Sequence, residues 1–192
     1  MKLSIKTKLK NKLENLTAHR KTRLEISDLV ILNPELFPEL LNYCFKIDDD
    51  ISYKAAWALE MVCEKKLSLL IPYFEIFFKN LPIVTKDQAV RPLSKICLFL
   101  TERDYKKRNF LLDIKHKEAI TECCFDWLIS NHKVATEAYA MRSLYFLGTE
   151  FDWIHPELII IIKKNIPDRT GAYQARGRMT LEKISKFQNK KK

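Results

Sequence analysis

The segment Ala56-Trp57-Ala58-Leu59 is the clearest sign of the fold, because it recurs along the chain at the spacing of a helical repeat. The segments that align with it are Val90-Arg91-Pro92-Leu93, Ala138-Tyr139-Ala140-Met141 and Ala175-Arg176-Gly177-Arg178. Successive segments are offset by 34, 48 and 37 residues, which brackets the length of a helix-pair repeat. Small side chains at these positions let helices approach closely, so that stacked pairs can share one continuous core.

A proline recurs in the same register. The segments that contain it are Leu36-Phe37-Pro38-Glu39-Leu40, Leu70-Ile71-Pro72-Tyr73-Phe74 and Ile154-His155-Pro156-Glu157-Leu158. Proline is favoured in the first turn of a helix, where its missing N–H has no intrahelical partner to lose. Each segment therefore predicts the start of the second helix of a pair.

Hydrophobic periodicity of about 3.6 residues outlines ten helices around these landmarks. Their expected ranges are 3–16, 21–32, 34–46, 51–65, 69–80, 86–101, 115–130, 133–147, 156–165 and 171–187. Residues 102–109 are charged and are predicted to be irregular. With only three glycines and little strict two-residue alternation, the chain is predicted to be all-α.

These landmarks resemble those of the HEAT-repeat family, whose repeats carry small residues in the first helix and a proline opening the second. The resemblance covers residues 21–187 and implies a right-handed α-α superhelix, a HEAT/ARM-like solenoid of four to five helix pairs. Residues 86–130 depart from the pattern because they lack the second-helix proline. Residues 1–20 are then interpreted as a basic amphipathic capping helix and residues 188–192 as a lysine-rich tail. HEAT-like folds serve scaffolds, adaptors, nucleic-acid binders and a few enzymes, so the fold does not imply a function.

A narrower resemblance rests on Asn33-Pro34-Glu35-Leu36-Phe37 and on Asp152-Trp153-Ile154-His155-Pro156-Glu157-Leu158. These phrases are similar to those of short bacterial chains that sometimes carry the label adenylosuccinate lyase. That lyase family is much longer and tetrameric, and it has a Ser-Ser-x-Met-Pro-x-Lys-x-Asn loop. The present sequence contains no Ser-Ser pair and no Met-Pro dipeptide, so its motifs do not support a lyase activity.

The net charge of +10 is concentrated at the two ends of the chain. Residues 1–23 carry +7 and residues 183–192 carry +5, whereas residues 24–182 carry −2. A basic tail is weaker evidence for specific nucleic-acid binding than a basic face on a rigid element. The five cysteines are scattered among apolar residues without a C-x-x-C spacing, which indicates buried thiols in a reducing compartment. Neither a secretory signal nor a membrane-spanning run is apparent, so a cytoplasmic location is expected.

The N-terminal helix combines an apolar face, formed by Ile5, Leu9, Leu13 and Leu16, with surrounding lysines. This pattern is typical of a helix that docks on a membrane surface or on a partner. It is equally typical of a cap that covers the open end of a helical stack, and the cap is the favoured interpretation.

A row of aromatic and arginine side chains is the leading candidate for a binding site. The aligned segments place Trp57, Arg91, Tyr139 and Arg176 at equivalent positions, and Lys54, Arg142 and Tyr173 lie one helical turn away. On residues 51–65 the apolar stripe is Ile51, Ala55, Ala58, Leu59 and Val62, so Trp57 is expected to point away from it. We call this set the ridge, and its composition is that of a protein-binding surface. Packing between neighbouring repeats explains the same aromatic residues, and that alternative stays open.

The leading functional hypothesis is therefore a non-enzymatic module that binds a protein partner through the ridge. Nucleic-acid binding through the basic termini is the alternative. A third hypothesis starts from the segments Phe125-Asp126-Trp127 and Phe151-Asp152-Trp153. They resemble the aspartate and tryptophans of HEAT-like DNA glycosylases. That resemblance would make Asp126 or Asp152 the catalytic acid. A net-negative body disfavours that reading. The four histidines have no ligand spacing, so no metal or other cofactor is expected.

Overall fold

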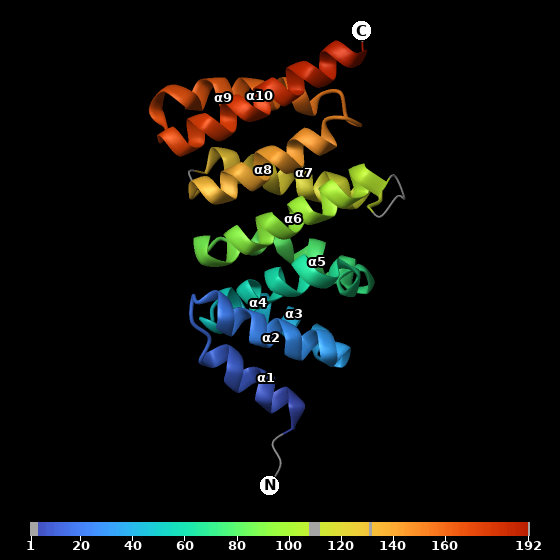
Figure 1. Ribbon diagram of the computed structural model, residues 1–192, viewed down its shortest axis with the longest axis vertical. Coiled ribbons are helices and arrows are strands. Elements are labelled where there is room, and N and C mark those ends of the chain that lie inside the picture. The colour runs from blue at the N-terminus through green and yellow to red at the C-terminus, as the bar shows by residue number, and fades with distance from the viewer. Residues whose placement is uncertain (1–3, 108–111, 131, 192) are drawn as a thin grey trace. The chain divides into compact units, whose positions relative to one another are not determined.

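The computed structural model describes residues 4–107, 112–130 and 132–191 of the chain. Every regular element in these residues is helical, and all ten expected helices are present (Figure 1). The helices are α1 (Ile5–Glu14), α2 (Arg20–Leu32), α3 (Phe37–Cys44), α4 (Ile51–Lys66), α5 (Phe74–Asn80), α6 (Asp87–Lys107), α7 (Ile114–Ile129), α8 (Val134–Leu147), α9 (Ile154–Asn165) and α10 (Gly171–Lys191). The prediction of an all-α fold is confirmed.

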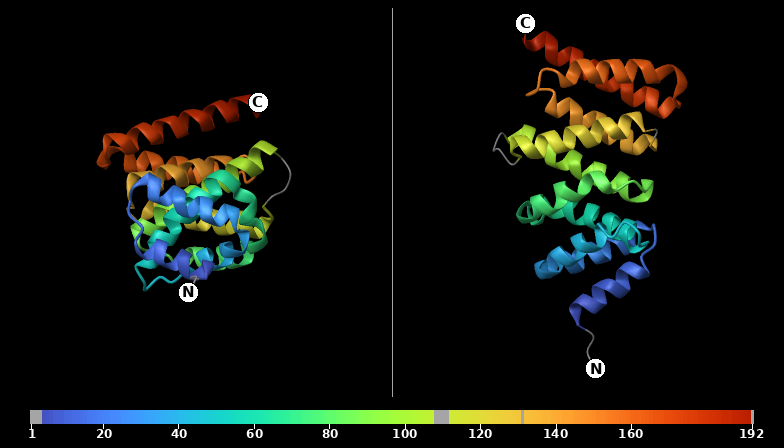
Figure 2. Two further views of the ribbon diagram at one scale, coloured as in Figure 1. Left: turned by 60° about the horizontal axis from the view of Figure 1, so that its bottom comes forward. Right: turned by 180° about the vertical axis from the view of Figure 1, so that it is seen from behind.

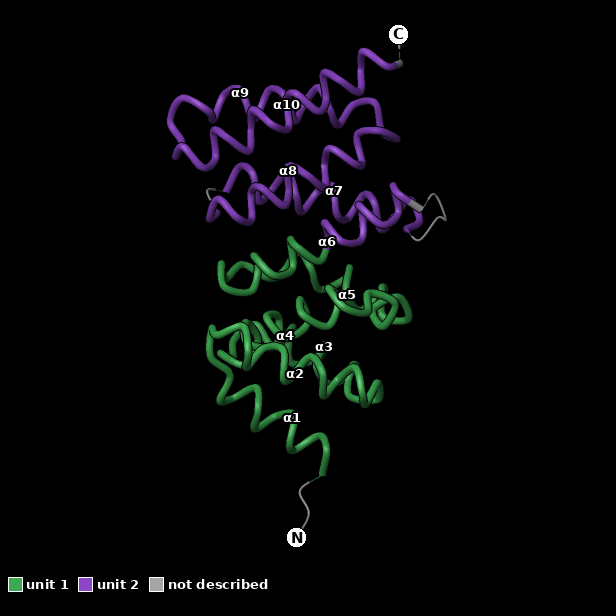
Figure 3. The backbone as a smooth tube through the Cα atoms, viewed as in Figure 1, with its two compact units in different colours: residues 1–96 green, residues 97–192 purple. Residues whose placement is uncertain are grey.

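The chain divides into two compact units, residues 1–96 and residues 97–192 (Figure 3). Helix α6 crosses the division, so that its first half belongs to one unit and its second half to the other.

Helix α4 lies at the centre of the first unit, where it contacts α1, α2 and α3. The expected apolar stripe of this helix is buried in full, and it comprises Ile51, Ala55, Ala58, Leu59 and Val62. Ala56, Glu60 and Met61 are buried as well, so α4 is covered on more sides than the stripe alone requires. The three alanines explain how this is possible, because short side chains let several helices approach one axis.

Helix α1 uses its apolar face inside the first unit. Leu9 and Leu13 are fully buried and Leu16 is nearly so, while α1 contacts α2 and α4. Ile5, at the start of the helix, stays 37% exposed. Most of the face that could have docked on a membrane or a partner is therefore covered by the chain itself.

Helix α8 lies at the centre of the second unit and contacts α7, α9 and α10. Its Ala140 and Leu144 are fully buried. Helices α9 and α10 lie side by side (Figures 1 and 2). A Cβ atom at Gly177 would lie 2.9 Å from Ile162 Cγ2, so this glycine permits the close approach of α10 to α9.

The sequence landmarks lie where their chemistry predicts. The third residue of each aligned segment is buried: Ala58, Pro92, Ala140 and Gly177. Pro38 is the second residue of α3, and Pro156 lies in the first turn of α9. Pro72 was expected inside the second helix of its pair, but it lies two residues before α5, in a 3₁₀ turn (Ile71–Tyr73) that leads into that helix.

The structure corrects two sequence-based boundaries. The stretch expected to be irregular, 102–109, is helical as far as Lys107, and residues 108 and 109 lie outside the described part of the chain. Its charges are compatible with a helix because Glu102 pairs with Lys106 one turn away, at 2.9 Å. Helix α10 likewise continues to Lys191 and does not end at residue 187, so lysines assigned to a tail extend a helix.

Two further observations concern the cysteines and the length and apolar character of the helices. All five cysteines are free and buried. Among the described residues, no helix combines the length and the apolar character needed to cross a bilayer.

Candidate functional site

The ridge residues of the first unit are engaged in contacts between helices. Trp57 on α4 donates its indole N–H to the backbone carbonyl of Gln88 on α6, at 3.0 Å. That carbonyl lacks its usual partner four residues later, because Pro92 has no N–H. Tyr53 packs edge-on against the Trp57 ring, with 5.1 Å between ring centroids. Trp57 thus supplies a hydrogen bond that α6 cannot make internally, which favours the packing interpretation of this residue.

The basic ridge residues of this unit are occupied in the same way. Glu60 on α4 is only 2% exposed and pairs with two cations of α6, Lys95 at 2.8 Å and Arg91 at 3.6 Å. Lys54 donates to the backbone carbonyl of Glu14 at the end of α1. A buried carboxylate needs such partners, because its desolvation would otherwise be uncompensated. These cations therefore stabilise the fold, and a partner that bound them would first have to break their internal contacts.

The ridge residues of the second unit differ in how far they are exposed to solvent. Tyr173 is 0% exposed, so the prediction that it belongs to an exposed surface is wrong. Arg142 is partly exposed and lies 3.5 Å from the carboxylate of Glu102. Tyr139 is partly exposed and Arg176 is exposed. Tyr173 is covered because α10 turns this residue inward, toward α8 and α9, at a helical phase that the alignment misjudged.

Tyr173 belongs instead to a buried ionic cluster. The Arg169 guanidinium lies over the Tyr173 ring, 5.0 Å from its centroid, and pairs with the fully buried Glu137 carboxylate. A cation held between an aromatic face and a carboxylate is stabilised from both sides. In the second unit, an aromatic ring and a carboxylate thus bind a cation together, and that cation is the chain's own Arg169.

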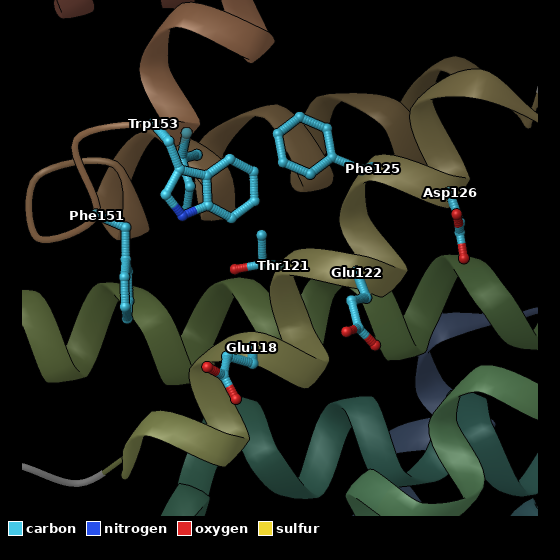
Figure 4. Close-up of a pocket in the computed structure, with 8 residues that line it drawn as sticks. Glu118, Thr121, Glu122, Phe125, Asp126, Phe151 and Trp153 are labelled. Atoms are coloured by element: carbon cyan, nitrogen blue, oxygen red, sulfur yellow. The ribbon is translucent and has the colours of Figure 1, made fainter.

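A groove on the second unit is a better candidate for a site that is open to a partner. It has a volume of about 590 Å³ and lies between α7 and the segment that enters α9. Its lining residues are Glu118, Thr121, Glu122, Phe125, Asp126, Phe151, Trp153 and Ile154 (Figure 4). We call it the α7–α9 groove.

Aromatic rings form one part of the α7–α9 groove. Phe125 and Trp153 stack with 5.8 Å between ring centroids and 25° between ring planes. Trp153 is 55% exposed, although it is the largest apolar side chain in the groove. Figure 4 shows Phe151 on the other side of Trp153, so three rings from two segments gather there. An exposed tryptophan held by a second ring resembles the anchor of a binding surface.

Carboxylates form the other part. Glu118, Glu122 and Asp126 are exposed and follow one another at four-residue spacing on α7, which places them on one helix face. Among the described residues, no basic side chain forms an ion pair with any of the three. Other carboxylates of the chain, such as Glu60 and Glu137, are paired internally. The groove therefore carries negative charge that no ion pair among the described residues neutralises.

The two motifs noted as acid-and-aromatic pairs meet at this groove. No family model, no curated protein and no solved structure matches this chain. The site must therefore be interpreted from its own chemistry. Three carboxylates in a row repel a phosphate backbone, which disfavours a nucleic-acid substrate at Asp126. Trp127 is buried, so of the two tryptophans in these motifs Trp153 is the one that is available to a ligand.

The five thiols are buried, and burial raises the pKa of each of them. Burial raises the pKa of the Cys44 and Cys123 thiols to about 12, and burial also raises the pKa of the other three thiols. Such thiols are protonated at neutral pH and poorly nucleophilic. Within the described residues, no three His, Cys, Asp or Glu side chains come together as metal ligands.

The sequence contained part of the signal for this groove. The repeated Phe-Asp-Trp motif identified Phe125, Asp126 and Trp153, and the structure brings these residues together. Glu118 and Glu122 were missed, because a carboxylate every four residues is also typical of an ordinary solvated helix face. Only the position of the α9 entry segment shows that this face borders a groove.

Proposed function

We propose that this chain is a non-enzymatic, HEAT-like helical module that binds a protein partner at the α7–α9 groove. The observation that carries the proposal is the 55% exposed Trp153, which is stacked on Phe125 beside three carboxylates that have no ion pair among the described residues. Exposed aromatic side chains in a concave site are typical anchors for a partner.

The repeat landmarks support the HEAT-like part of the proposal. Four segments at the spacing of helix pairs each bury their small or cyclic third residue, and prolines open α3 and α9. The central helices of the two units, α4 and α8, both carry an alanine-aromatic-alanine segment. This correspondence is expected if both units derive from one repeated helix pair of a solenoid.

The α7–α9 groove replaces the ridge as the proposed docking site. Trp57, Arg91 and Lys54 already contact other helices, and Tyr173 is buried. Binding through those residues would first break internal contacts, whereas Trp153 has more than half of its surface available.

Nucleic-acid binding is the second candidate, and helix α10 is the observation that favours it. The basic residues of this helix include Arg176, Arg178, Lys183 and Lys186, all of them exposed. They lie on a continuous helix and not on a frayed tail, which strengthens the electrostatic argument.

Site-specific photocrosslinking from lysate tests both candidates. A photoreactive residue replaces either Phe125, at the groove, or Arg176, on α10, and each capture is repeated after nuclease treatment. The proposal predicts a nuclease-resistant protein adduct at position 125 that Trp153→Ala reduces at least about fivefold, because the anchor is removed. Capture only at position 176, and only without nuclease, would instead establish nucleic-acid binding through α10.

A further inference from the structure

The α7–α9 groove also indicates which kind of partner segment would bind there. The chemistry of the bound segment can be inferred from the groove on the basis of the proposed function. Three features of the groove indicate this chemistry: the negative charge of its carboxylates, its aromatic rings and the spacing of the carboxylates.

The negative charge of the groove favours a partner that supplies a cation. Glu118, Glu122 and Asp126 stand four residues apart, and like charges at this spacing repel one another along a helix. Among the described residues no basic side chain forms an ion pair with them. A positively charged partner removes this repulsion, whereas an acidic partner increases it.

The aromatic rings favour the same kind of ligand. The face of tryptophan is the best aromatic surface for a lysine or arginine cation. Figure 4 shows the Trp153 indole above α7, with Glu118 and Glu122 extending from that helix nearby. A basic side chain on Trp153 would therefore meet carboxylates within the same groove.

The described part of the chain already contains an example of this combination. Arg169 lies over the ring of Tyr173 and pairs with Glu137, all within the second unit. The α7–α9 groove contains the aromatic and carboxylate parts of such a site, without an internal cation among the described residues.

The spacing indicates how basic residues should be arranged in the partner. Four residues of helix rise about 6 Å. Two residues of an extended chain advance about 6.6 Å. Lysine or arginine at alternate positions of an extended segment would therefore match successive carboxylates of α7, with a difference that flexible side chains can absorb.

We propose that the α7–α9 groove binds an extended basic segment of a partner protein, with lysine or arginine at alternate positions. One cationic side chain lies on Trp153, and its two neighbours on the same side of the segment face two successive carboxylates of the row Glu118, Glu122 and Asp126. The volume of about 590 Å³ suits a segment of a few residues better than a single side chain.

Calorimetric titration with short capped peptides tests this proposal. The probes are Lys-Thr-Lys-Thr-Lys and its charge-reversed counterpart Glu-Thr-Glu-Thr-Glu, each titrated into the full chain at low salt and again at about fourfold higher salt. The basic peptide is expected to bind and the acidic peptide is not. Raising the salt should weaken binding several-fold, since the contacts are electrostatic.

Matched variants locate the binding. Trp153→Ala should weaken the basic peptide about five- to tenfold, and so should the double variant Glu118→Gln/Glu122→Gln. The control is Glu35→Gln/Glu75→Gln, which makes the same change in net charge at exposed residues of the first unit and should leave binding unchanged. Circular dichroism verifies that each variant is folded.

The outcomes separate this inference from the proposed function. No binding of the basic peptide, or binding that the groove variants leave intact, overturns the inference, while a protein adduct at position 125 would still support the function. Equal binding of a Lys-Lys-Lys-Thr-Thr peptide overturns the alternate spacing. A wild-type dimer that Trp153→Ala converts to a monomer would identify a second copy of the chain as the occupant and would also overturn the inference.

Discussion

Trp57 and Pro92 are linked through one carbonyl oxygen. Pro92 lies inside α6 and leaves the Gln88 carbonyl without its intrahelical donor, and the Trp57 indole provides the missing hydrogen bond at 3.0 Å. A helix-interior proline is usually costly, and here part of that cost is offset by a side chain of another helix. The same contact explains why a half-buried tryptophan at a repeated position is not a free binding anchor.

The link predicts a measurable coupling between the two residues. Trp57→Phe should lower the free energy of unfolding by about 1–2 kcal/mol, because a carbonyl loses its donor and some apolar contact is lost. In a Pro92→Ala background the introduced alanine can supply the N–H, so the same tryptophan substitution should cost about 1 kcal/mol less. Urea unfolding of the wild type, both single variants and the double variant measures this difference. Strict additivity of the two substitutions would contradict the assignment.

Gly148 shows how strongly one small residue can constrain a site. A Cβ atom there would lie 2.1 Å from Cδ2 of His155, which is buried and whose Nε2 lies 2.9 Å from the Tyr145 carbonyl. The close approach lets the end of α8 and the start of α9 meet. The α9 entry segment that carries Trp153 is therefore anchored by His155, two residues later in the chain.

The pairing of α6 with α7 depends on a buried ionic network. Lys117 of α7 lies 3.0 Å from Asp104 of α6 and 2.6 Å from Glu150, which follows α8. Asp104 also accepts the backbone N–H of Leu112 at 3.1 Å, just before α7. Lys117 and Asp104 are both buried, so each depends on the other for compensation. This network stabilises helical structure in the charged end of α6, which the sequence pattern suggested was irregular.

Removing the cation should weaken the second unit in a pH-dependent way. Burial alone lowers the pKa of Lys117, but hydrogen bonds to Glu150 and Asp104 outweigh it and raise the pKa above its ordinary value of 10.5. A raised pKa contributes stability that is complete below 10.5 and is lost as the pH rises through the folded-state value. Lys117→Met should therefore cost on the order of 3 kcal/mol at neutral pH.

Chemical unfolding of the wild type and the Lys117→Met variant, from neutral pH to about one unit above the ordinary lysine pKa, checks this prediction. The difference in stability should be constant at neutral and mildly alkaline pH. It should narrow above pH 10.5, where this lysine deprotonates in the unfolded chain while the folded protein still holds the proton. Lys186→Met is the control, because the pair that Lys186 makes with Glu182 is exposed. A gap that stays constant across the whole range would show that packing, and not charge, explains the loss.

Across the whole molecule, the cysteines report on burial in both units. Cys44 and Cys63 belong to the first unit, and Cys97, Cys123 and Cys124 belong to the second. All are buried, and burial raises the pKa of each thiol. A thiol reagent needs both access and a thiolate, and the folded chain offers neither.

The folded protein should therefore react with a thiol-specific chromogenic reagent at mildly alkaline pH at least about a hundredfold more slowly than the unfolded chain. Unfolding in urea should expose all five thiols. Time courses at intermediate urea, with mass spectrometry of the labelled cysteines, would show which unit opens first. Rapid labelling of any thiol without denaturant would contradict the buried assignment for that cysteine.

Periodicity and small-residue landmarks were sufficient to predict the helices and much of the core. The expected stripe of α4 is buried as predicted, and the structure also buries the third residue of each of the four aligned segments. These features depend on the phase of a helix, which is written in consecutive residues. The charged end of α6 was missed because its stabilising partner, Lys117, lies in another helix.

The candidate site was harder to predict, for a different physical reason. The ridge was inferred from composition, but whether Trp57 or Tyr173 is available depends on which neighbouring helix covers it. Phe125 and Trp153 were noted separately in sequence, and only their stacking across α7 and the α9 entry makes them one surface. Helix phase is a local property that consecutive residues of the sequence determine. The exposure of a side chain depends on contacts between residues far apart in the chain, so only the packing of the helices decides it.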